Sequence, residues 1–400
     1  MDQDERELSF TNSKAKVKAK NKKNQLKKGF TTGSAATAAA KAALHSLIYG
    51  ECPANIKIKA NNDYILNIPI TCCFSSNPLQ TQSFFYCGVK KDAGDDPDVT
   101  DGILVFSRVK LTDSPGVFKI KGGEGVGMVT KPGLPVRPGE PAINPGPKEM
   151  LKNNLVDLIP LGKGLEVEIQ IPEGAMIAKK TLNEKLGIEK GISVLGTTGI
   201  VEPYSKEAYK DSLYVQLHQV KSWDIKTIVF TPGKIGENNA KKLNIPEKNI
   251  VFISNFVGSM LSKAKDTLDS DCSILIFGHI GKLSKLAAGI FQTHSREADG
   301  RKEVFITHAA LNGGSISLLK QIYSAGTTEE ILGLLEQSEN LKSKVLNSIV
   351  KEVTFRAREH IRGYFKLGAA LTDREGNILA ACDNAKFILE KEGWSWEKLT

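Results

Sequence analysis

Apolar runs and helical periodicity alternate regularly from about residue 225 onwards. Three units place an apolar run, a glycine-containing turn and an amphipathic segment in the same order: KTIVFTPGKIGENNAKKL, NIVFISNFVGSMLSKAKD and CSILIFGHIGKLSKLAAG. The runs begin about 23 residues apart, and apolar strands that alternate with helices are typical of a parallel sheet. We therefore predict a Rossmann-like parallel α/β domain over residues 221–400.

The C-terminal part of this domain is expected to be mainly helical. Residues 299–365 have helical periodicity, and Thr327 before two glutamates is a helix-start signal. Residues 369–382, AALTDREGNILAAC, predict a hairpin that is followed by a short helix. None of the turns reads GxGxxG, so the dinucleotide fingerprint is missing and a nicotinamide enzyme is disfavoured.

The first half of the chain instead shows the two-residue alternation that is typical of half-buried strands. Apolar positions on both sides of Asn61-Asn62-Asp63 predict a hairpin, and further strands are expected over residues 83–89, 103–110 and 165–171. A helix is expected from Pro147, because proline suits the first helical turn. We predict an α+β domain over residues 29–220, which makes the chain a multi-domain α/β and α+β protein.

An alanine-rich helix is predicted where order should begin, at Gly29. The string GFTTGSAATAAAKAALHSLIYG places Thr31 and Thr32 ahead of a strong helix former. Hydroxyls at this positive helix end can hold an anion or simply cap the helix, and both interpretations stay open. The string from Gly196 through Thr197 and Thr198 to Gly199 repeats the arrangement and could face the same ligand, although common turn chemistry explains it equally well.

A glycine- and proline-rich segment follows the strand predicted at residues 117–121. Its glycines at Gly123, Gly125 and Gly127 can align backbone N–H groups around an anion, although glycines in such a spacing also serve bulges and turns. The following prolines stiffen the segment, and Lys131 and Arg137 on it are candidate partners for carboxylates.

Clustered carboxylates, Asp95 and Asp96 among them, occupy the turn KKDAGDDPDVTDG. We rank a ligand-facing turn first, a solvated loop second and a Mg²⁺ or Ca²⁺ site third. The segment lacks the glutamate that ends an EF-hand loop.

The densest polar chemistry lies in GHIGKLSKLAAGIFQTHSREADGR, at the carboxyl end of a predicted strand. Open parallel sheets bind their ligands at that edge, and a glycine turn before a helix favours an anion. This segment carries two histidines, which suit proton transfer near neutral pH, and three cations, which suit carboxylates: His279, His294, Lys282, Lys285 and Arg296.

Composition and charge indicate the cellular compartment of the protein and exclude some classes of partner. Residues 1–28 carry nine basic and four acidic residues, so this predicted disordered tail supplies +5 of the net +9. This tail could contact nucleic acid or an acidic partner, but we favour a solvated extension and expect no nucleic-acid partner. We expect no membrane partner because no apolar tract is long enough to cross a membrane. No secretory signal is evident, and the six cysteines show no CxxC or framework spacing, so we expect reduced thiols, no metal site and a cytoplasmic location. The oligomeric state is not predicted.

Six strings resemble the CbiD family in the same order from about Gly29 to Arg301. They are GFTTGSAATAAAKAAL, KKDAGDDPDVTDG, GGEGVGMVTKPGL with EPAINPGPKEM, LGTTGIVEPYS, SNFVG and GHIGKLSKLAAGIFQTHSREADGR. The resemblance implies a cobalt-precorrin-5B C-1-methyltransferase of anaerobic cobalamin biosynthesis, which forms cobalt-precorrin-6A. The implied methyl donor is S-adenosylmethionine, and cobalt enters only as part of the tetrapyrrole substrate.

This implied chemistry assigns roles to the candidate residues. A general base is expected at His279 or His294. Substrate carboxylates are expected to meet Thr31, Thr32, Asp95, Asp96, Lys131, Arg137, Thr197, Thr198, Lys282, Lys285 and Arg296. The donor is expected first at Gly233, Gly236, Asn255, Gly258, Gly278 and Gly281, and second at Gly123, Gly125 and Gly127.

Two other classes of function use the same features. A corrinoid-binding module without catalysis would need the same anion-binding groups. A phosphate-handling enzyme would use the glycine-rich loop, with Asp95 or Asp96 on Mg²⁺.

Overall fold

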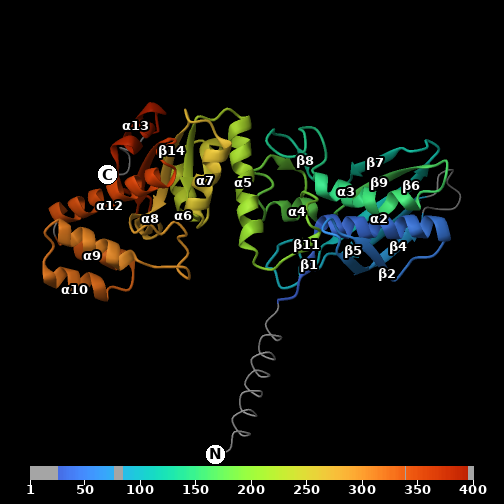
Figure 1. Ribbon diagram of the computed structural model, residues 1–400, viewed down its shortest axis with the longest axis horizontal. Helices are drawn as coiled ribbons and strands as arrows, with labels where there is room; N and C mark the ends of the chain where they lie inside the picture. The colour runs from blue at the N-terminus through green and yellow to red at the C-terminus, as the bar shows by residue number, and fades with distance from the viewer. Residues whose placement is uncertain (1–25, 76–83, 338, 395–400) are drawn as a thin grey trace, which may run out of the picture. The chain divides into compact units, whose positions relative to one another are not determined.

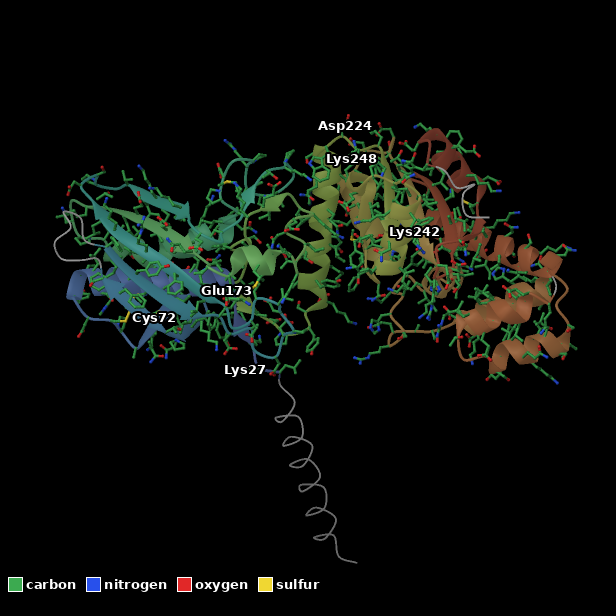
Figure 2. All side chains as sticks on the ribbon, turned by 180° about the vertical axis from the view of Figure 1, so that it is seen from behind. Lys27, Cys72, Glu173, Asp224, Lys242 and Lys248 are labelled. Atoms are coloured by element: carbon green, nitrogen blue, oxygen red, sulfur yellow. A yellow bond between two sulfur atoms is a disulfide. The ribbon has the colours of Figure 1, made fainter. Side chains whose placement is uncertain are left out.

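The computed structural model describes residues 26–75, 84–337 and 339–394, and the chain divides into two compact units, Met1–Ser205 and Lys206–Thr400 (Figure 1). The disorder predicted for residues 1–25 lies outside the described residues. Order begins before Gly29, contrary to our expectation, because Lys27 and Lys28 already pair with Asp92 and Glu202. Lys27 is labelled in Figure 2.

The first unit contains a five-stranded sheet in the order β4-β5-β6-β9-β7. Neighbouring strands are antiparallel except β7, which runs parallel to β9. The strands predicted from two-residue alternation are confirmed with small shifts of their ends. Their bounds are β5 Phe84–Lys90, β6 Leu104–Thr112, β7 Phe118–Gly122 and β9 Gly164–Gln170, and the edge strand β4 (Cys72–Ser75) was not predicted.

Helix α2 (Thr32–Tyr49) packs against β5 and β6 and is the predicted alanine-rich helix. Its small side chains are fully buried, which lets the helix approach the sheet closely enough for Ser107 Oγ to donate to Ala36 O at 2.8 Å. Thr31 caps its start, and Gly50 ends it in the left-handed conformation that glycine favours. Helix α3 (Pro145–Leu155) packs beside α2 and continues into the 3₁₀ turn η1 (Val156–Leu158).

The remaining elements of the first unit are short. The predicted hairpin is confirmed as β2 (Asn55–Lys59) and β3 (Ile65–Pro69). Two further ladders and one helical turn complete the unit: β1 (Gly29–Phe30) with β11 (Ile200–Val201), β8 (Met128–Val129) with β10 (Ile188–Glu189), and α4 (Gly174–Ala178).

The second unit contains a five-stranded sheet in the order β13-β12-β14-β15-β16. The first four strands are parallel and β16 is antiparallel. The three predicted strand–helix units supply β12 (Thr227–Thr231), β13 (Ile250–Phe252) and β14 (Ser273–His279). The predicted C-terminal hairpin is β15 (Lys366–Thr372) with β16 (Ile378–Ala381), and β15 extends the parallel sheet beside β14.

Helices connect and cover these strands, and the predicted helical region 299–365 is confirmed. Thr327 caps its helix by accepting from Glu330 N–H at 3.1 Å, as the sequence indicated. The bounds are α5 Lys206–Ser222, α6 Lys234–Lys242, η2 Glu247–Asn249, α7 Val257–Thr267, α8 Ile280–Ala287, α9 Arg301–Leu311, α10 Ile316–Ser324, α11 Thr328–Leu335, α12 Glu339–His360 and α13 Asp383–Lys391.

The boundary between the units differs from the one expected near residue 220. Helix α5 was assigned to the first domain, but it belongs to the second unit. Its apolar face, with Leu213, Leu217 and Val220, is buried in the same core as the parallel sheet. Burial of that face fixes the helix to the sheet, and the junction moves to Ser205–Lys206.

Within the described ranges, no helix is long and apolar enough to cross a membrane.

Candidate functional site

The parallel sheet of the second unit has a switch point between β12 and β14. From β12 the chain crosses to β13 on one side, and then returns to β14 on the other side. Crossover helices therefore leave in opposite directions at this point, and open parallel sheets typically bind ligands in a crevice at the carboxyl ends of such strands. At this edge, the turn Pro232-Gly233 joins β12 to α6, and β14 ends at His279 and passes directly into α8 at Ile280.

His279 caps helix α8 at this edge. Its Nδ1 accepts from Gly281 N–H at 3.2 Å, and its Nε2 lies 3.3 Å from Glu329 Oε1. Glu329 Oε1 also forms an ion pair with Arg374 Nε, at 2.6 Å. Burial lowers the pKa of His279 and outweighs the opposing charge of Glu329. The imidazole is therefore neutral at neutral pH and oriented by contacts at both nitrogens.

Lys282, on the first turn of α8, reaches across the crevice toward the turn after β12. A Cβ added at Gly233 would lie 2.8 Å from Lys282 Nζ, and Gly233 has a φ of 96°. The half-buried ammonium makes no hydrogen bond or ion pair with the part of the chain that the structure describes. Burial lowers its pKa, and the charge of Lys285 lowers the pKa further. Such an ammonium is suited to an anionic group of a ligand.

Lys285 lies one turn further along α8 and has a different environment. It is buried, and its Nζ donates to Thr293 O at 3.2 Å and to Ala298 O at 2.9 Å. These bonds attach the segment after α8 to the helix. His294 and Arg296 on that segment are exposed, and Arg296 N–H donates to His294 Nδ1 at 3.1 Å.

The predicted glycine turns allow close packing at this edge. A Cβ at Gly236 would lie 3.1 Å from Phe277 O, and one at Gly278 would lie 3.2 Å from Pro232 Cδ. Asn255 is held in the neighbouring turn, where its carbonyl accepts from Thr293 N–H at 3.0 Å. Any larger residue at Gly236 or Gly278 would therefore push α6 away from the end of β14.

A cavity of about 590 Å³ lies beside the turn after β13. Of the residues that line this cavity, only Gly258 was among the candidate site residues predicted from the sequence. Helices α5 and α7 contribute Lys206, Lys210 and Lys263, while the ring of Phe291 stacks on His360 with centroids 4.4 Å apart. Three cations beside aromatic rings suit a flat anionic ligand.

In the first unit, the two threonine–glycine strings lie side by side, as the repeated pattern suggested. Thr31 N–H donates to Gly199 O at 3.1 Å, and a Cβ at Gly196 would overlap the Thr31 hydroxyl. The Thr32 hydroxyl donates to Leu195 O at 3.2 Å and accepts from Leu195 N–H at 3.0 Å. Both threonines are buried. The Thr31 hydroxyl is already used to cap α2, and the Thr32 hydroxyl is already used to attach the loop.

Thr197 and Thr198 are exposed at the tip of the same loop. Asn61 Nδ2 holds the loop against the start of α3 by donating to Gly146 O at 3.0 Å and to Thr197 O at 3.1 Å. The N-terminal ends of α2 and α3 thus meet at one exposed loop. Two helix dipoles favour an anion there.

The acidic turn forms internal contacts. Asp95 accepts from Lys27 N–H at 2.6 Å, and Asp96 accepts from Tyr204 N–H at 2.8 Å. The buried Lys91 pairs with Asp98 at 2.6 Å. These carboxylates attach the chain entry and the end of the first unit to one turn, so the turn is not the freely solvated loop we ranked second. The ligand-facing role of Asp95 and Asp96 stays a prediction.

The glycine-rich loop packs tightly against its neighbours. Gly123 N–H donates to Ile169 O at 2.7 Å and Gly127 N–H to Ile192 O at 2.9 Å, so two of the three predicted nest donors are used by the backbone. Gly125 has a φ of 68°, and a Cβ on it would overlap Ile171 O. Lys131 and Arg137 are exposed on the following segment.

The fold defines a two-unit α/β protein with an antiparallel-rich sheet in one unit and a mainly parallel sheet in the other. The CbiD family model matches residues 18–203, and the model of the CbiD C-terminal domain matches residues 292–383. The chain belongs to the CbiD family.

Relatives along nearly the whole chain are named cobalt-precorrin-5B C(1)-methyltransferase. One from Alkaliphilus metalliredigens is 40% identical and covers 92% of this chain and 95% of the relative. One from Methanocaldococcus jannaschii is 42% identical and covers 88% of this chain and 95% of the relative. The crystal structure of a cobalamin biosynthesis protein from Archaeoglobus fulgidus has 27% identity and a TM-score of 0.36, and covers 68% of this chain and 83% of that one.

Proposed function

We propose that this chain transfers a methyl group from S-adenosylmethionine to C-1 of cobalt-precorrin-5B. Relatives with about 40% identity over most of the chain bear the name of that activity. The single structural observation that carries the proposal is the unpartnered, half-buried Lys282 at the switch point of the sheet. This is the edge where parallel sheets bind small ligands.

The donor binds at this edge, in the crevice bordered by Gly233 and Gly281. Lys282 binds its carboxylate, since a charge-assisted bond to a half-buried ammonium is stronger than one in water. The neutral His279 and the carboxylate of Glu329 lie beside the start of α8 and suit the cationic end of the donor. The second candidate, the loop at Gly123–Gly127, has fewer free N–H groups for this role.

The first unit offers groups that suit the carboxylates of the tetrapyrrole. The loop at Gly196–Gly199 meets two helix N-termini and exposes Thr197 and Thr198. Lys131 and Arg137 add exposed cations. Of the predicted carboxylate partners, Thr31, Thr32 and Lys285 act by positioning these loops, because their polar atoms are already bonded inside the protein.

The transfer forms a bond from the ring carbon to the methyl group and breaks the S–CH₃ bond, so the sulfonium becomes a neutral thioether. This reaction requires an in-line geometry and exclusion of water more than acid–base help. Where a proton must leave the macrocycle, the neutral imidazole of His279 is the better acceptor. His294 is exposed and less well fixed.

The direct test incubates the full chain with cobalt-precorrin-5B and S-adenosylmethionine that carries a ¹³C-labelled methyl group. We expect one label at C-1 and one S-adenosylhomocysteine per product molecule. A chain that binds the tetrapyrrole but transfers no label, and has no affinity for S-adenosylhomocysteine, would instead be a corrinoid-binding module.

A further inference from the structure

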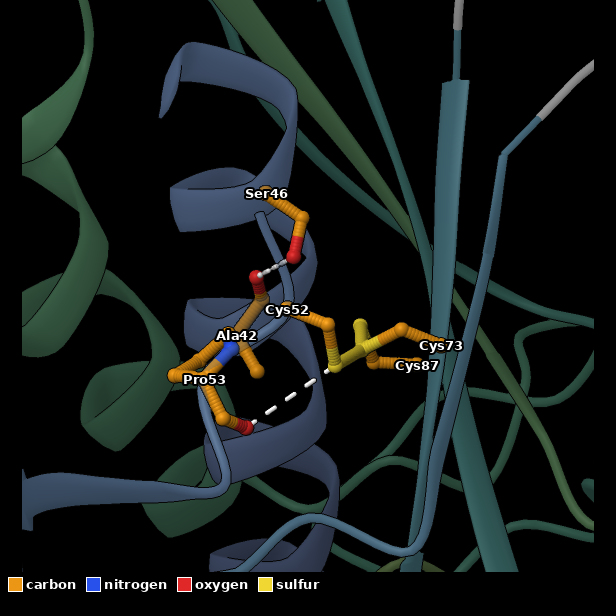
Figure 3. The surroundings of a disulfide bond; sticks show 6 residues. All are labelled: Ala42, Ser46, Cys52, Pro53, Cys73 and Cys87. Atoms are coloured by element: carbon orange, nitrogen blue, oxygen red, sulfur yellow. Dashed lines mark hydrogen bonds between the residues drawn. A yellow bond between two sulfur atoms is a disulfide. The ribbon is translucent and has the colours of Figure 1, made fainter. Parts of the chain in front are cut away.

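Three cysteines that are unrelated by sequence spacing converge in the first unit. Cys52 lies just after α2, Cys73 on β4 and Cys87 on β5, and Figure 3 shows their side chains pointing toward one another. Their Sγ atoms all lie within 4.8 Å of one another. Cys73 and Cys87 are opposite each other in the β4–β5 ladder, with Cα atoms 4.1 Å apart, and the Cα atoms of Cys52 and Cys73 are 6.1 Å apart.

The sulfur of Cys73 lies within bonding reach of both Cys52 and Cys87. A sulfur atom forms one disulfide bond, so the two pairs cannot exist in the same molecule. A disulfide would therefore use two of the converging sulfurs and leave the third as a thiol. A metal ion bound by thiolates uses all three, and it needs no oxidant.

The burial of the three side chains is graded. Cys87 is fully buried, Cys73 is half-buried and Cys52 is exposed. One side of the cluster therefore lies open to solvent, which gives an ion a way in and leaves room for a water molecule as a fourth ligand. Zinc is typically bound by sulfur at about 2.3 Å in a tetrahedral arrangement, and three Sγ atoms within 4.8 Å of one another are close enough to share one ion.

We propose that Cys52, Cys73 and Cys87 bind one zinc ion as thiolates. Each thiol loses its proton on binding, and a water molecule completes the tetrahedron. The ion joins the edge strand β4 and the segment after α2 to the inner strand β5, so it stabilises this part of the first unit. Within the described residues, these are the only three or more His, Cys, Asp or Glu side chains that are close enough to share a metal ion.

Cys72 provides a matched control on the same strand. Adjacent strand residues point to opposite faces, and the Cys72 thiol is free and packs near Gly88 on the other face. A Cys72→Ser substitution therefore changes the same strand without touching the cluster.

The test measures zinc in the full chain, purified in a thiol-free reductant, stripped with chelator and reloaded with ZnSO₄. We expect one zinc per chain by elemental analysis, retained in Cys72→Ser. In Cys52→Ser and Cys87→Ser we expect the affinity to fall by at least about 100-fold, because one of three thiolates is lost. Co²⁺ loading should give sulfur-to-metal charge-transfer absorption of equal strength in the wild type and in Cys72→Ser, and weaker absorption in Cys52→Ser and Cys87→Ser. Circular dichroism checks folding, and Cys52→Ser, at an exposed position, keeps the test valid if Cys87→Ser unfolds.

Two results would overturn this proposal. One is zinc that binds equally well to wild type and Cys52→Ser. The other is a reduced chain that binds no zinc and forms a Cys52–Cys73 or Cys73–Cys87 disulfide on mild oxidation, as found by mass spectrometry of alkylated peptides.

Discussion

The N-terminal ends of α2 and α8 are built from similar parts but differ in what they leave unbonded. Each begins at the end of a strand, β1 or β14, and each is capped by a side chain, Thr31 in one and His279 in the other. Around α2, both threonines are buried: the Thr31 hydroxyl accepts from Ser34 N–H, and the Thr32 hydroxyl is bonded to Leu195 in the loop at residues 195–199. On α8, the Lys282 ammonium has no partner among the described residues. Threonine–glycine turns can thus serve assembly, and we propose the ligand site where a cation has no partner among the described residues.

Replacing Gly196 with alanine should have the largest effect, because it breaks the packing at the start of α2. The new Cβ would overlap the Thr31 hydroxyl at a backbone φ of 137°. We expect a loss of about 3–5 kcal/mol in the free energy of unfolding, combining steric overlap with backbone strain. Urea denaturation measures it. Gly139→Ala is the control, since Gly139 also has a positive φ but open space around it; an equal loss in both variants would rule out the overlap.

Replacing Lys282 with alanine should weaken binding of the donor with little change in stability. Loss of a charge-assisted hydrogen bond costs about 1.5–3 kcal/mol, which corresponds to a roughly 10- to 150-fold higher Kd for S-adenosylhomocysteine. Isothermal titration calorimetry measures it, with the exposed Lys320→Ala as control. An unchanged Kd would remove Lys282 from the donor site.

Replacing Lys285 with methionine should show the opposite pattern. The bonds to Thr293 O and Ala298 O are lost, and we expect the free energy of unfolding to fall by about 1–2 kcal/mol. The Kd for S-adenosylhomocysteine should change less than in Lys282→Ala. Thermal melts and calorimetry on both variants give the comparison, and a reversed pattern would mean that the two lysines had been assigned the wrong way round.

The smallest expected effect is the pH dependence from His279. Its pKa is lowered in the folded state, so the unfolded chain binds the proton more readily. Stability is therefore complete above the ordinary histidine pKa and falls as the pH drops below it, by less than about 1.4 kcal/mol per pH unit. His279→Asn keeps a cap acceptor and cannot titrate, so urea denaturation between pH 7.5 and 5.5, about one unit to either side of that pKa, should show a smaller slope. Equal slopes would mean that His279 titrates normally.

Local patterns predicted most of the elements. Apolar runs gave the strands β12, β13 and β14, and cap residues such as Thr31 and Thr327 gave helix starts. Pairing between distant segments was not predictable, because local periodicity shows that a segment is a strand but not which distant strand it pairs with. The sequence therefore did not show that β15 lies beside β14, or that Cys52, Cys73 and Cys87 converge.

The candidate site was predictable as a segment but not residue by residue. The turn at His279 was found because an apolar strand, glycines and a helix start follow one another. Lys282 and Lys285 could not be told apart, since both lie near one helix start. Their difference arises from packing: one faces the turn at Gly233 and the other faces the carbonyl groups of the segment after α8. Glu329, which contacts His279 from α11, gave no local signal.

The most direct test of the donor site is hydrogen–deuterium exchange of the full chain with and without S-adenosylhomocysteine. We predict protection of the backbone in residues 231–237 and 278–286, at the carboxyl ends of β12 and β14, and none in residues 122–128. Protection confined to residues 122–128, with the sheet edge unchanged, would contradict this placement.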